Sequence, residues 1–346
     1  MTDVSQVDVI APNFKKRLSG VTSTIFRLVP LQAEKIAIVA TGPVIPADVP
    51  GMPLAALLTM NRRRRVWHAR RNIEMIAGIA LKTLLGKNLK LMFTSASQRH
   101  HTGLTKWLIR RMDEIVATSA KSAAYLERPA HVIHHGIDAE RFSPSTDKAA
   151  LRRQLGLPET GMLIGCYGRI RAQKGTDVFV DAMIRVLPRH PGATALVMGR
   201  ATKKYQDFER ELRDRVAAAG LSDRILFLPE VPVLEMAGFY QVLDLYVAPQ
   251  RWEGFGLTPL EAMSCGAPVV ATRVGAFEEL VAEGETGTLV DPGDIDAMTV
   301  AVDAALSDPG RLAQWSTAAR DRVLAQFQLQ QEADALIAIY RRLLSD

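Results

Sequence analysis

The sequence is poor in cysteine and lacks long apolar runs. Its 346 residues include two cysteines, Cys166 and Cys265, which excludes a disulfide framework or a zinc site built on cysteine ligands. We interpret both as small buried side chains, as is typical of a reducing compartment. The apolar stretch at residues 76–85 is interrupted by Lys82 and is shorter than the roughly 18–20 residues of a membrane span. The N-terminus lacks a charged region followed by an apolar one, so we expect no secretory leader.

Several familiar motifs are also missing. The sequence has no Walker A spacing, no Gly-x-Gly-x-x-Gly and no Gly-x-Ser-x-Gly. These absences argue against a P-loop, a nicotinamide dinucleotide site and a serine-hydrolase elbow. The histidine pairs His100-His101 and His134-His135 have no ligand partner four residues away, so neither predicts a metal site. We interpret those histidines as structural.

Charge is distributed unevenly. Apolar residues make up 48% and charged residues 23% of the chain, which is typical of a globular protein long enough for two domains. Through Ser145 there are 21 basic and 10 acidic residues, and from Thr146 onward 22 and 27. The densest basic run is Arg62–Arg65, followed by Arg70 and Arg71. It predicts either a solvated face or an anionic partner such as lipid or a phosphorylated acceptor. Nucleic acid is disfavoured, because aromatics do not interleave with the cations and no binding motif is present.

Short apolar strands alternate with helical patterns in both halves. Expected strands include residues 7–11, 36–40 and 89–94 in the first half, and 162–167, 195–198 and 245–248 in the second. Strands without polar alternation indicate sheets buried on both faces. We therefore predict an α/β fold of two doubly wound, Rossmann-like parallel-sheet domains facing a cleft. The expected domains are residues 1–145 and 146–325, with a final helix at 326–346 that packs back on the first.

Polar residues gather after four predicted strands, where open parallel sheets bind ligands. The strongest candidate runs from Glu253 to Glu261, where Gly254 and Gly256 permit close backbone approach and a helix starts near Thr258. The alternative, non-functional interpretation of this segment is an exposed turn followed by a helix whose glutamate forms a salt bridge. The segment Gly168–Gly175 carries Arg169 and Lys174 and predicts a phosphate clamp, unless these are ordinary loop cations.

Two weaker candidates lie in the basic half. Ser19-Gly20 opens the first helix and indicates either a close approach to phosphate or acceptor, or a simple helix cap. The segment Thr94–His101 follows the strand at 89–94 and contains Arg99, His100 and His101.

Taken together, these motifs resemble a known family. Glu253–Glu261, with its continuation to Thr272, is similar to the Glu-x7-Glu signature of retaining GT-B glycosyltransferases of group 1 (family 4). The segment Gly168–Gly175 resembles that family's phosphate loop, and His135–Pro144 its interdomain segment. The match is close in the second half and follows the family's pattern in the first.

The resemblance implies roles for individual residues. The C-terminal domain is expected to bind a nucleotide sugar, with Glu261 on the ribose and Glu253 on the sugar hydroxyls. Arg169 and Lys174 would neutralise charge on the leaving diphosphate, in place of a metal. We expect no divalent metal and no cofactor. The implied donor-binding residues are Gly20, Arg169, Lys174, Glu253, Gly254, Phe255, Gly256, Leu257, Thr258 and Glu261; Arg169, Lys174 and Glu253 are also the catalytic candidates.

Within the family, the chain is most similar to lipopolysaccharide core mannosyltransferases. That resemblance implies transfer of mannose from GDP-mannose to the Kdo of a lipid A precursor, at the cytoplasmic face of the inner membrane. Many relatives carry a histidine directly after the strand at 89–93, where this chain has Thr94 or Ser95. The candidate acceptor-binding residues are Lys15, Lys16, Arg17, Arg99, His100 and His101.

Other functions remain open at this point. A nucleotide-sugar epimerase would release epimerised donor without an acceptor. A glycosyltransferase with another donor and acceptor would share the same motifs. A non-catalytic nucleotide-sugar sensor would bind donor without turnover, and a nucleic-acid binder would depend steeply on salt.

Overall fold

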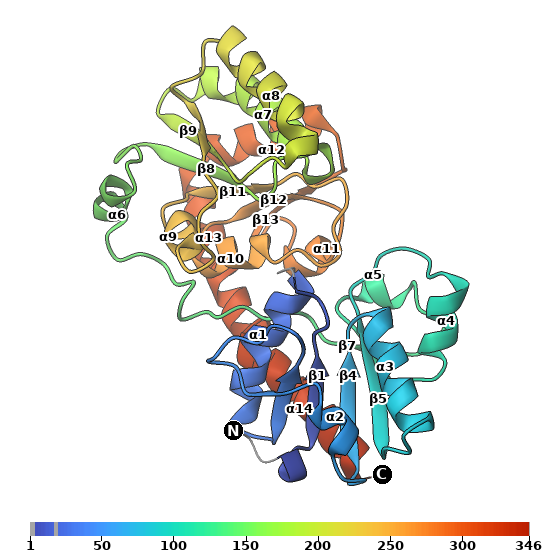
Figure 1. Ribbon diagram of the computed structural model, residues 1–346. Coiled ribbons are helices and arrows are strands. Elements are labelled where there is room, and N and C mark those ends of the chain that lie inside the picture. Colours follow the sequence, from blue (N-terminus) through green and yellow to red (C-terminus); the bar gives the residue numbers. More distant parts are fainter. Residues whose placement is uncertain (1–3, 17–19, 346) are drawn as a thin grey trace. The chain divides into compact units, whose positions relative to one another are not determined.

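The computed structural model describes residues 4–16 and 20–345 (Figure 1). The chain forms two compact units, Met1–His135 with Leu329–Asp346, and Gly136–Gln328. These divisions fall after His135 and Gln328, whereas the sequence placed them after residues 145 and 325. Residues 136–145 belong to the second unit because the Ile137 amide donates to the Phe327 carbonyl at 2.8 Å and Phe142 packs in that unit's core.

The N-terminal unit contains a parallel sheet of seven strands in the order β3-β2-β1-β4-β5-β6-β7. The strands are β1 (Val9–Pro12), β2 (Ile38–Thr41), β3 (Gly51–Met52), β4 (Arg65–Ala69), β5 (Leu89–Ser95), β6 (Glu114–Ala117) and β7 (His131–Val132). The helices are α1 (Gly20–Ala33), α2 (Ala56–Thr59), α3 (Asn72–Thr83), α4 (Gly103–Ile109), α5 (Ala120–Ala123) and the final helix α14 (Leu329–Ser345).

The C-terminal unit contains a parallel sheet of six strands in the order β10-β9-β8-β11-β12-β13. The strands are β8 (Met162–Tyr167), β9 (Ala193–Met198), β10 (Ile225–Leu228), β11 (Leu245–Ala248), β12 (Val269–Thr272) and β13 (Gly287–Val290). The helices are α6 (Lys148–Gln154), α7 (Thr176–Val186), α8 (Gln206–Ala218), α9 (Met236–Gln241), α10 (Thr258–Ser264), α11 (Phe277–Leu280), α12 (Ile295–Ser307) and α13 (Pro309–Gln326). The prediction of two doubly wound parallel sheets is confirmed.

Apolar side chains cover both faces of each sheet, as the strand composition predicts. In the N-terminal unit, Trp67 and Phe93 belong to the core on one face, while Val66 and Met92 belong to the core on the other. Helix α14 packs on the second of these faces with Leu336, Ile337 and its neighbours, beside α1. The end of the chain therefore completes the core of the N-terminal unit.

Strand β4 was missed from the sequence because the basic run Arg62–Arg65 obscures its start. Arg65 is the first residue of β4 and is fully buried. Its guanidinium donates to the carbonyl oxygens of Asn61 at 2.8 Å and Val4 at 3.1 Å. Burial lowers the pKa of Arg65. These contacts pair its two terminal nitrogens, while its Nε has no hydrogen-bond partner within the described residues. The basic run Arg62–Arg65 is therefore not uniformly exposed to solvent, since Arg65 is buried and stabilises the fold.

Arg71 corrects the interpretation of the next basic pair. Its guanidinium lies 2.8 Å from the buried Glu74 carboxylate and 3.0 Å from Asn13 Oδ1. The ion pair balances the charge of the buried Glu74 carboxylate. The contact with Asn13 links the segment after β1 to the start of α3. Arg71 is thus committed to the fold and not to an external anion.

Candidate functional site

The loops that follow β8 and β9 approach each other closely at the carboxyl edge of the C-terminal sheet. Gly168 follows β8 and Gly199 follows β9, with φ values of 140° and 149°. A Cβ atom on Gly199 would lie 1.9 Å from the Gly168 carbonyl oxygen. Any side chain at position 199 would separate the two loops, so glycine is required for this edge to form.

The predicted phosphate loop returns from β8 to α7 through a short turn at Ala172–Lys174. Gly175 ends this turn in the left-handed region, at φ 69°. A Cβ there would lie 1.8 Å from the Pro249 carbonyl oxygen, directly after β11. The loop from β8 therefore packs against the segment after β11, and the two strand ends share one site.

Lys174 and Glu253 meet at this point. The Lys174 ammonium forms an ion pair with the Glu253 carboxylate, and both side chains are about one-fifth exposed. Glu253 Oε1 also accepts from the amide of Gly254 at 3.0 Å. The two residues, predicted from separate motifs 79 positions apart, are thus in direct contact and reachable by a ligand.

Arg251 and Asp177 support the same site and were not predicted. The Arg251 guanidinium binds the Asp177 carboxylate through two contacts of 2.7 and 2.8 Å. Its backbone amide donates to the Gln173 carbonyl at 3.0 Å. The hydrogen bonds that Arg251 donates to Asp177 raise the pKa of Arg251. A bidentate pair of this geometry holds the loops after β8 and β11 in register. Arg251 and Asp177 are 74 positions apart, so no local sequence pattern marks their contact.

Arg169 differs from Lys174. It directly follows Gly168 and is exposed, and it has no ion-pair partner within residues 4–16 and 20–345. Among the described residues of the loop after β8, Lys174 is therefore paired with a carboxylate and Arg169 is not.

The segment from Glu253 to Glu261 folds tightly against the start of α11. Gly256 has φ 88°, and a Cβ on it would lie 2.3 Å from the Phe277 ring. Phe255 is buried in the core, and its carbonyl oxygen accepts from the Ala276 amide at 3.1 Å. Leu257 precedes the first residue of α10, Thr258, and Pro259 occupies an early helical position where its missing N–H is tolerated.

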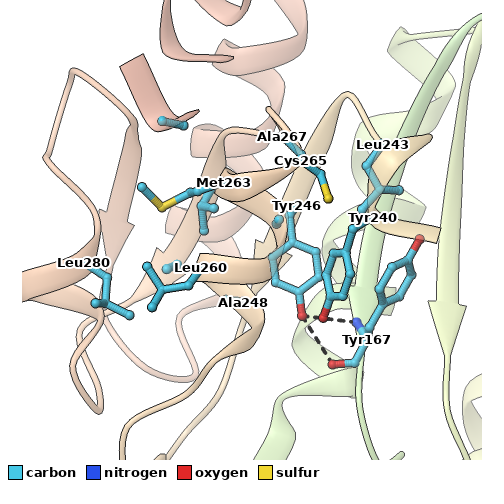
Figure 2. Packing of buried hydrophobic residues seen from close by; sticks show 14 of the residues in the cluster. Tyr167, Tyr240, Leu243, Tyr246, Ala248, Leu260, Met263, Cys265, Ala267 and Leu280 are labelled. Atoms are coloured by element: carbon cyan, nitrogen blue, oxygen red, sulfur yellow. Dashed lines mark hydrogen bonds between the residues drawn. The ribbon is translucent and has the colours of Figure 1, made fainter. Parts of the chain in front are cut away.

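Glu261 lies on α10 beside a group of three buried tyrosines, shown in Figure 2. Tyr246 donates to the Tyr167 carbonyl oxygen at 3.2 Å. Tyr240 packs edge-on against Tyr167 with ring centroids 5.0 Å apart. Burial raises the pKa of Tyr240 well above its usual value, and the neighbouring Glu261 carboxylate raises it further. The hydroxyls of Tyr240 and Tyr246 therefore lie close enough to the Glu261 carboxylate for its charge to act on both.

The candidate residues of the N-terminal unit are placed on separate loops. Gly20 opens α1 and is exposed, and a Cβ on it would meet nothing within 4 Å, so packing does not require glycine there. Lys15 and Lys16 are exposed on the segment after β1. Arg17 and Ser19 lie outside the described residues.

The loop after β5 carries the other acceptor candidates. Arg99 and His100 are exposed, and the His100 ring packs edge-on against Tyr125 at 5.3 Å. His101 is partly buried, and burial, followed by the charges of Arg99 and Lys106, lowers its pKa. His101 is therefore a neutral imidazole at neutral pH. His135, by contrast, contacts the Glu332 carboxylate on α14 at 2.7 Å, which confirms its structural interpretation.

No helix in the described part of the chain is both long and apolar enough to cross a bilayer. Across the same residues, no three histidine, cysteine, aspartate or glutamate side chains are grouped to hold a metal ion.

The parallel strand order of the two α/β units is that of the GT-B fold. Residues 147–322 match the family of glycosyl transferases group 1. The chain is 52% identical to the lipopolysaccharide core biosynthesis mannosyltransferase LpsB of Rhizobium meliloti (strain 1021), over 99% of this chain and 100% of that protein. It is 50% identical to the lipopolysaccharide core biosynthesis mannosyltransferase LpcC of Rhizobium leguminosarum bv. viciae, over 100% and 99%. This protein belongs to the group 1 glycosyl transferases.

A solved structure supports the fold assignment. The crystal structure of Anabaena HepE in complex with UDP matches with a TM-score of 0.85, over 97% of this chain and all of that chain. Sequence identity is 19%, so this likeness bears on the fold alone.

Proposed function

We propose that this protein transfers mannose from a nucleotide sugar to an anionic acceptor in the synthesis of the lipopolysaccharide core. The observation that carries the proposal is the match along nearly the whole chain to LpsB and LpcC, at 52% and 50% identity. A match that includes both units supports a shared donor and a shared class of acceptor. We assign GDP-mannose as the donor and the Kdo of a lipid A precursor as the acceptor.

The contact between Lys174 and Glu253 suits a nucleotide sugar. In such a donor, the diphosphate and the sugar are directly linked, so their binding groups must be neighbours. Lys174 would bind the diphosphate, and Glu253 would accept hydrogen bonds from the sugar hydroxyls. Arg169, exposed on the same loop, would add a second positive charge at the phosphates.

The remaining donor contacts come from the segment that ends in α10. The amides of Gly254, Phe255 and Gly256 would line the sugar, and those of Leu257 and Thr258 would face the diphosphate. Glu261 would hold the ribose hydroxyls from its position above Tyr240. Gly20 would contribute a backbone contact from the N-terminal unit.

In the proposed chemistry, the acceptor oxygen forms a bond to the sugar carbon on the face from which the diphosphate leaves, so configuration is retained. The bond between the sugar and the diphosphate breaks, and the hydroxyl proton passes to an oxygen of the departing diphosphate. Negative charge on the diphosphate is greatest in the transition state, so Lys174 and Arg169 stabilise that state more than the bound donor. We assign no metal ion to this step.

The acceptor would bind the basic N-terminal unit. Lys15, Lys16 and Arg17, with Arg99, His100 and His101, are the proposed contacts, because the acceptor carries phosphates and carboxylates. Lys15, Lys16, Arg99 and His100 are exposed and therefore reachable.

We further propose that the protein lies peripherally on the cytoplasmic face of the inner membrane. Helices α3 and α4 contact each other, and both expose large apolar side chains. Leu84, at the end of α3, is 81% exposed, and Trp107 on α4 is 45% exposed with the Arg111 guanidinium 3.6 Å over its ring. Apolar side chains beside cations favour an anionic lipid surface.

The test is incubation of the purified protein with GDP-mannose and Kdo-lipid A, with mass spectrometry of the lipid. A mannosylated lipid is the expected product. The Lys174→Ala variant should form it about 10²–10³-fold more slowly, whereas Lys203→Ala, which changes an exposed lysine of the same unit, should form it at the wild-type rate. Turnover of another nucleotide sugar without mannosyl product would overturn the donor assignment. Release of an epimerised nucleotide sugar without acceptor would identify an epimerase, and donor binding without turnover would identify a sensor.

A further inference from the structure

A buried histidine links the final helix to the carboxyl end of β5. His68 Nδ1 lies 2.6 Å from the Tyr340 hydroxyl on α14, and His68 Nε2 lies 2.6 Å from the Thr94 hydroxyl. His68 and Tyr340 are fully buried, while Thr94 is partly exposed. The three side chains therefore form a chain of hydrogen bonds that begins inside the core and ends at the surface.

The strand register explains how these residues meet. His68 of β4 is paired with Met92 of β5, and Thr94 follows Met92 by two residues. Side chains two residues apart share one face of a sheet. Met92 belongs to the core that α14 covers, so His68 and Thr94 face α14 as well. Thr94 is the penultimate residue of β5 and thus lies at the edge where parallel sheets bind ligands.

His68 carries one ring proton at neutral pH. Burial lowers the pKa of His68 well below its usual value, and the nearby charge of Arg70 lowers it further. A neutral imidazole donates from one nitrogen and accepts at the other. The two hydroxyls on either side must therefore be oriented in one common direction.

The positive charge of Arg70 sets that direction. Burial raises the pKa of Tyr340 to about 12, while the charge of Arg70 opposes the increase. A lone pair of the Tyr340 oxygen is favoured on the side that faces this charge, so the Tyr340 proton turns toward His68 Nδ1. His68 Nε2–H then donates to the Thr94 oxygen, and the Thr94 proton points away from His68.

Thr94 is consequently an oriented donor at the sheet edge. Within the described residues, His68 is the sole hydrogen-bond partner of the Thr94 hydroxyl. Successive hydrogen bonds polarise one another, which strengthens donation from the last member of the chain.

We propose that the Thr94 hydroxyl donates a hydrogen bond to a carboxylate or hydroxyl oxygen of the sugar acceptor, and that His68 and Tyr340 are positioning residues that orient it. This inference rests on the proposed function for the identity of the acceptor. The orientation of the chain of hydrogen bonds does not depend on it.

The first test measures acceptor binding without donor, by titration calorimetry with Kdo-lipid A in detergent. Thr94→Val should weaken acceptor binding about tenfold, and Thr94→Ser should restore it, while GDP-mannose affinity stays unchanged. The control Thr83→Val removes an exposed threonine of α3 whose hydroxyl serves only its own helix. A change in donor affinity with acceptor affinity unaltered would overturn the ligand assignment.

The second test asks whether Tyr340 acts through Thr94. Tyr340→Phe should weaken acceptor binding about threefold in the wild-type background and have no further effect in the Thr94→Val background. Equal effects in both backgrounds would overturn the coupling. If Thr94→Val and Tyr340→Phe each lowered the midpoint temperature of unfolding but left acceptor affinity unchanged, the role of these residues would be purely structural. That result would also contradict the proposal.

The third test is independent of the reaction. Long-range 1H–15N correlation of the histidine rings should show the Nε2–H tautomer for His68, and Tyr340→Phe should alter it while Tyr205→Phe does not. An Nδ1–H tautomer in the wild-type protein would overturn the proposed direction. Wild-type protein that shows the Nε2–H tautomer but neither binds nor mannosylates the acceptor would instead overturn the proposed function and, with it, the assigned ligand.

Discussion

The two units share a fold but use their charged residues differently. In the C-terminal unit, Lys174 and Glu253 lie on loops at the carboxyl edge of the sheet and stay partly exposed. In the N-terminal unit, Arg65 begins a strand, and Arg71 pairs with the buried Glu74. Arg65 thus lies at the opposite edge from the loop after β5. Whether a cation can bind a ligand is better predicted by the end of the strand at which it lies than by the number of cations nearby. The reason is that parallel sheets bind ligands at the carboxyl ends of their strands.

The largest expected effect concerns the exposed pair of the C-terminal unit. Lys174→Ala should lower kcat by about 10²–10³-fold, since it removes a charge that stabilises the departing diphosphate. Steady-state release of nucleoside diphosphate measures this effect. Lys203→Ala is the matched control, and a similar loss in both variants would show that overall charge, rather than position, matters.

A buried cation of the N-terminal unit should affect stability and not donor binding. Arg65→Met should lower the free energy of unfolding by about 3 kcal/mol, because carbonyl oxygens of Asn61, Arg63 and Val4 lose their donor. Urea unfolding measures this change, with the exposed Arg62→Met as control. If Arg65→Met and Arg62→Met had the same free energy of unfolding, the distinction between a structural arginine and an exposed one would be wrong. GDP-mannose affinity of folded Arg65→Met should equal that of the wild type.

The carboxylate above the tyrosines gives a smaller effect in the C-terminal unit. Glu261→Gln should raise the KM for donor about tenfold, because a charged acceptor of ribose hydrogen bonds becomes neutral. Initial rates at varied GDP-mannose test this, with the exposed Glu285→Gln as control. An unchanged KM would remove Glu261 from the donor site.

The exposed apolar side chains of α3 and α4 give the smallest effect. Leu84→Ser combined with Trp107→Ser should weaken binding to anionic phospholipid vesicles about five- to tenfold, since less apolar surface is buried in the lipid. Vesicle sedimentation measures it. Leu234→Ser is the control, because Leu234 is equally exposed but belongs to the C-terminal unit. An equal loss in the control would mean that membrane binding is not confined to the N-terminal unit.

The C-terminal half could be predicted almost entirely from sequence. The strands at Met162–Tyr167, Leu245–Ala248 and Gly287–Val290 have the expected bounds. Their apolar runs are bounded by glycine, proline or polar loops, so local signals coincide with the elements. The candidate site is similarly local, since Glu253 to Glu261 is one continuous segment. Its supporting pair Arg251–Asp177 was missed, because ion pairs between distant segments leave no local pattern.

The N-terminal half was harder to predict. Strand β4 was obscured by charge, because a buried arginine at a strand start has the same sequence appearance as a surface cation. For the same reason, the sequence predicted either a solvated face or an anionic partner for Arg71, although its partner Glu74 lies three residues away. Sequence alone did not distinguish a charge that the protein neutralises internally from one left for a ligand.

The sequence by itself determined the alternation of strands and helices, the two parallel sheets and the glycine-bounded loops, since each depends on residues close together along the chain. Tertiary structure alone decided which charges remain available and which are buried. It also brought Tyr340 of the last helix to His68 and Thr94, 272 and 246 positions earlier in the chain. These contacts depend on tertiary structure because folding must first bring the two partners together. Once the partners are removed from water, the hydrogen bond between them is stronger than the same bond at the surface.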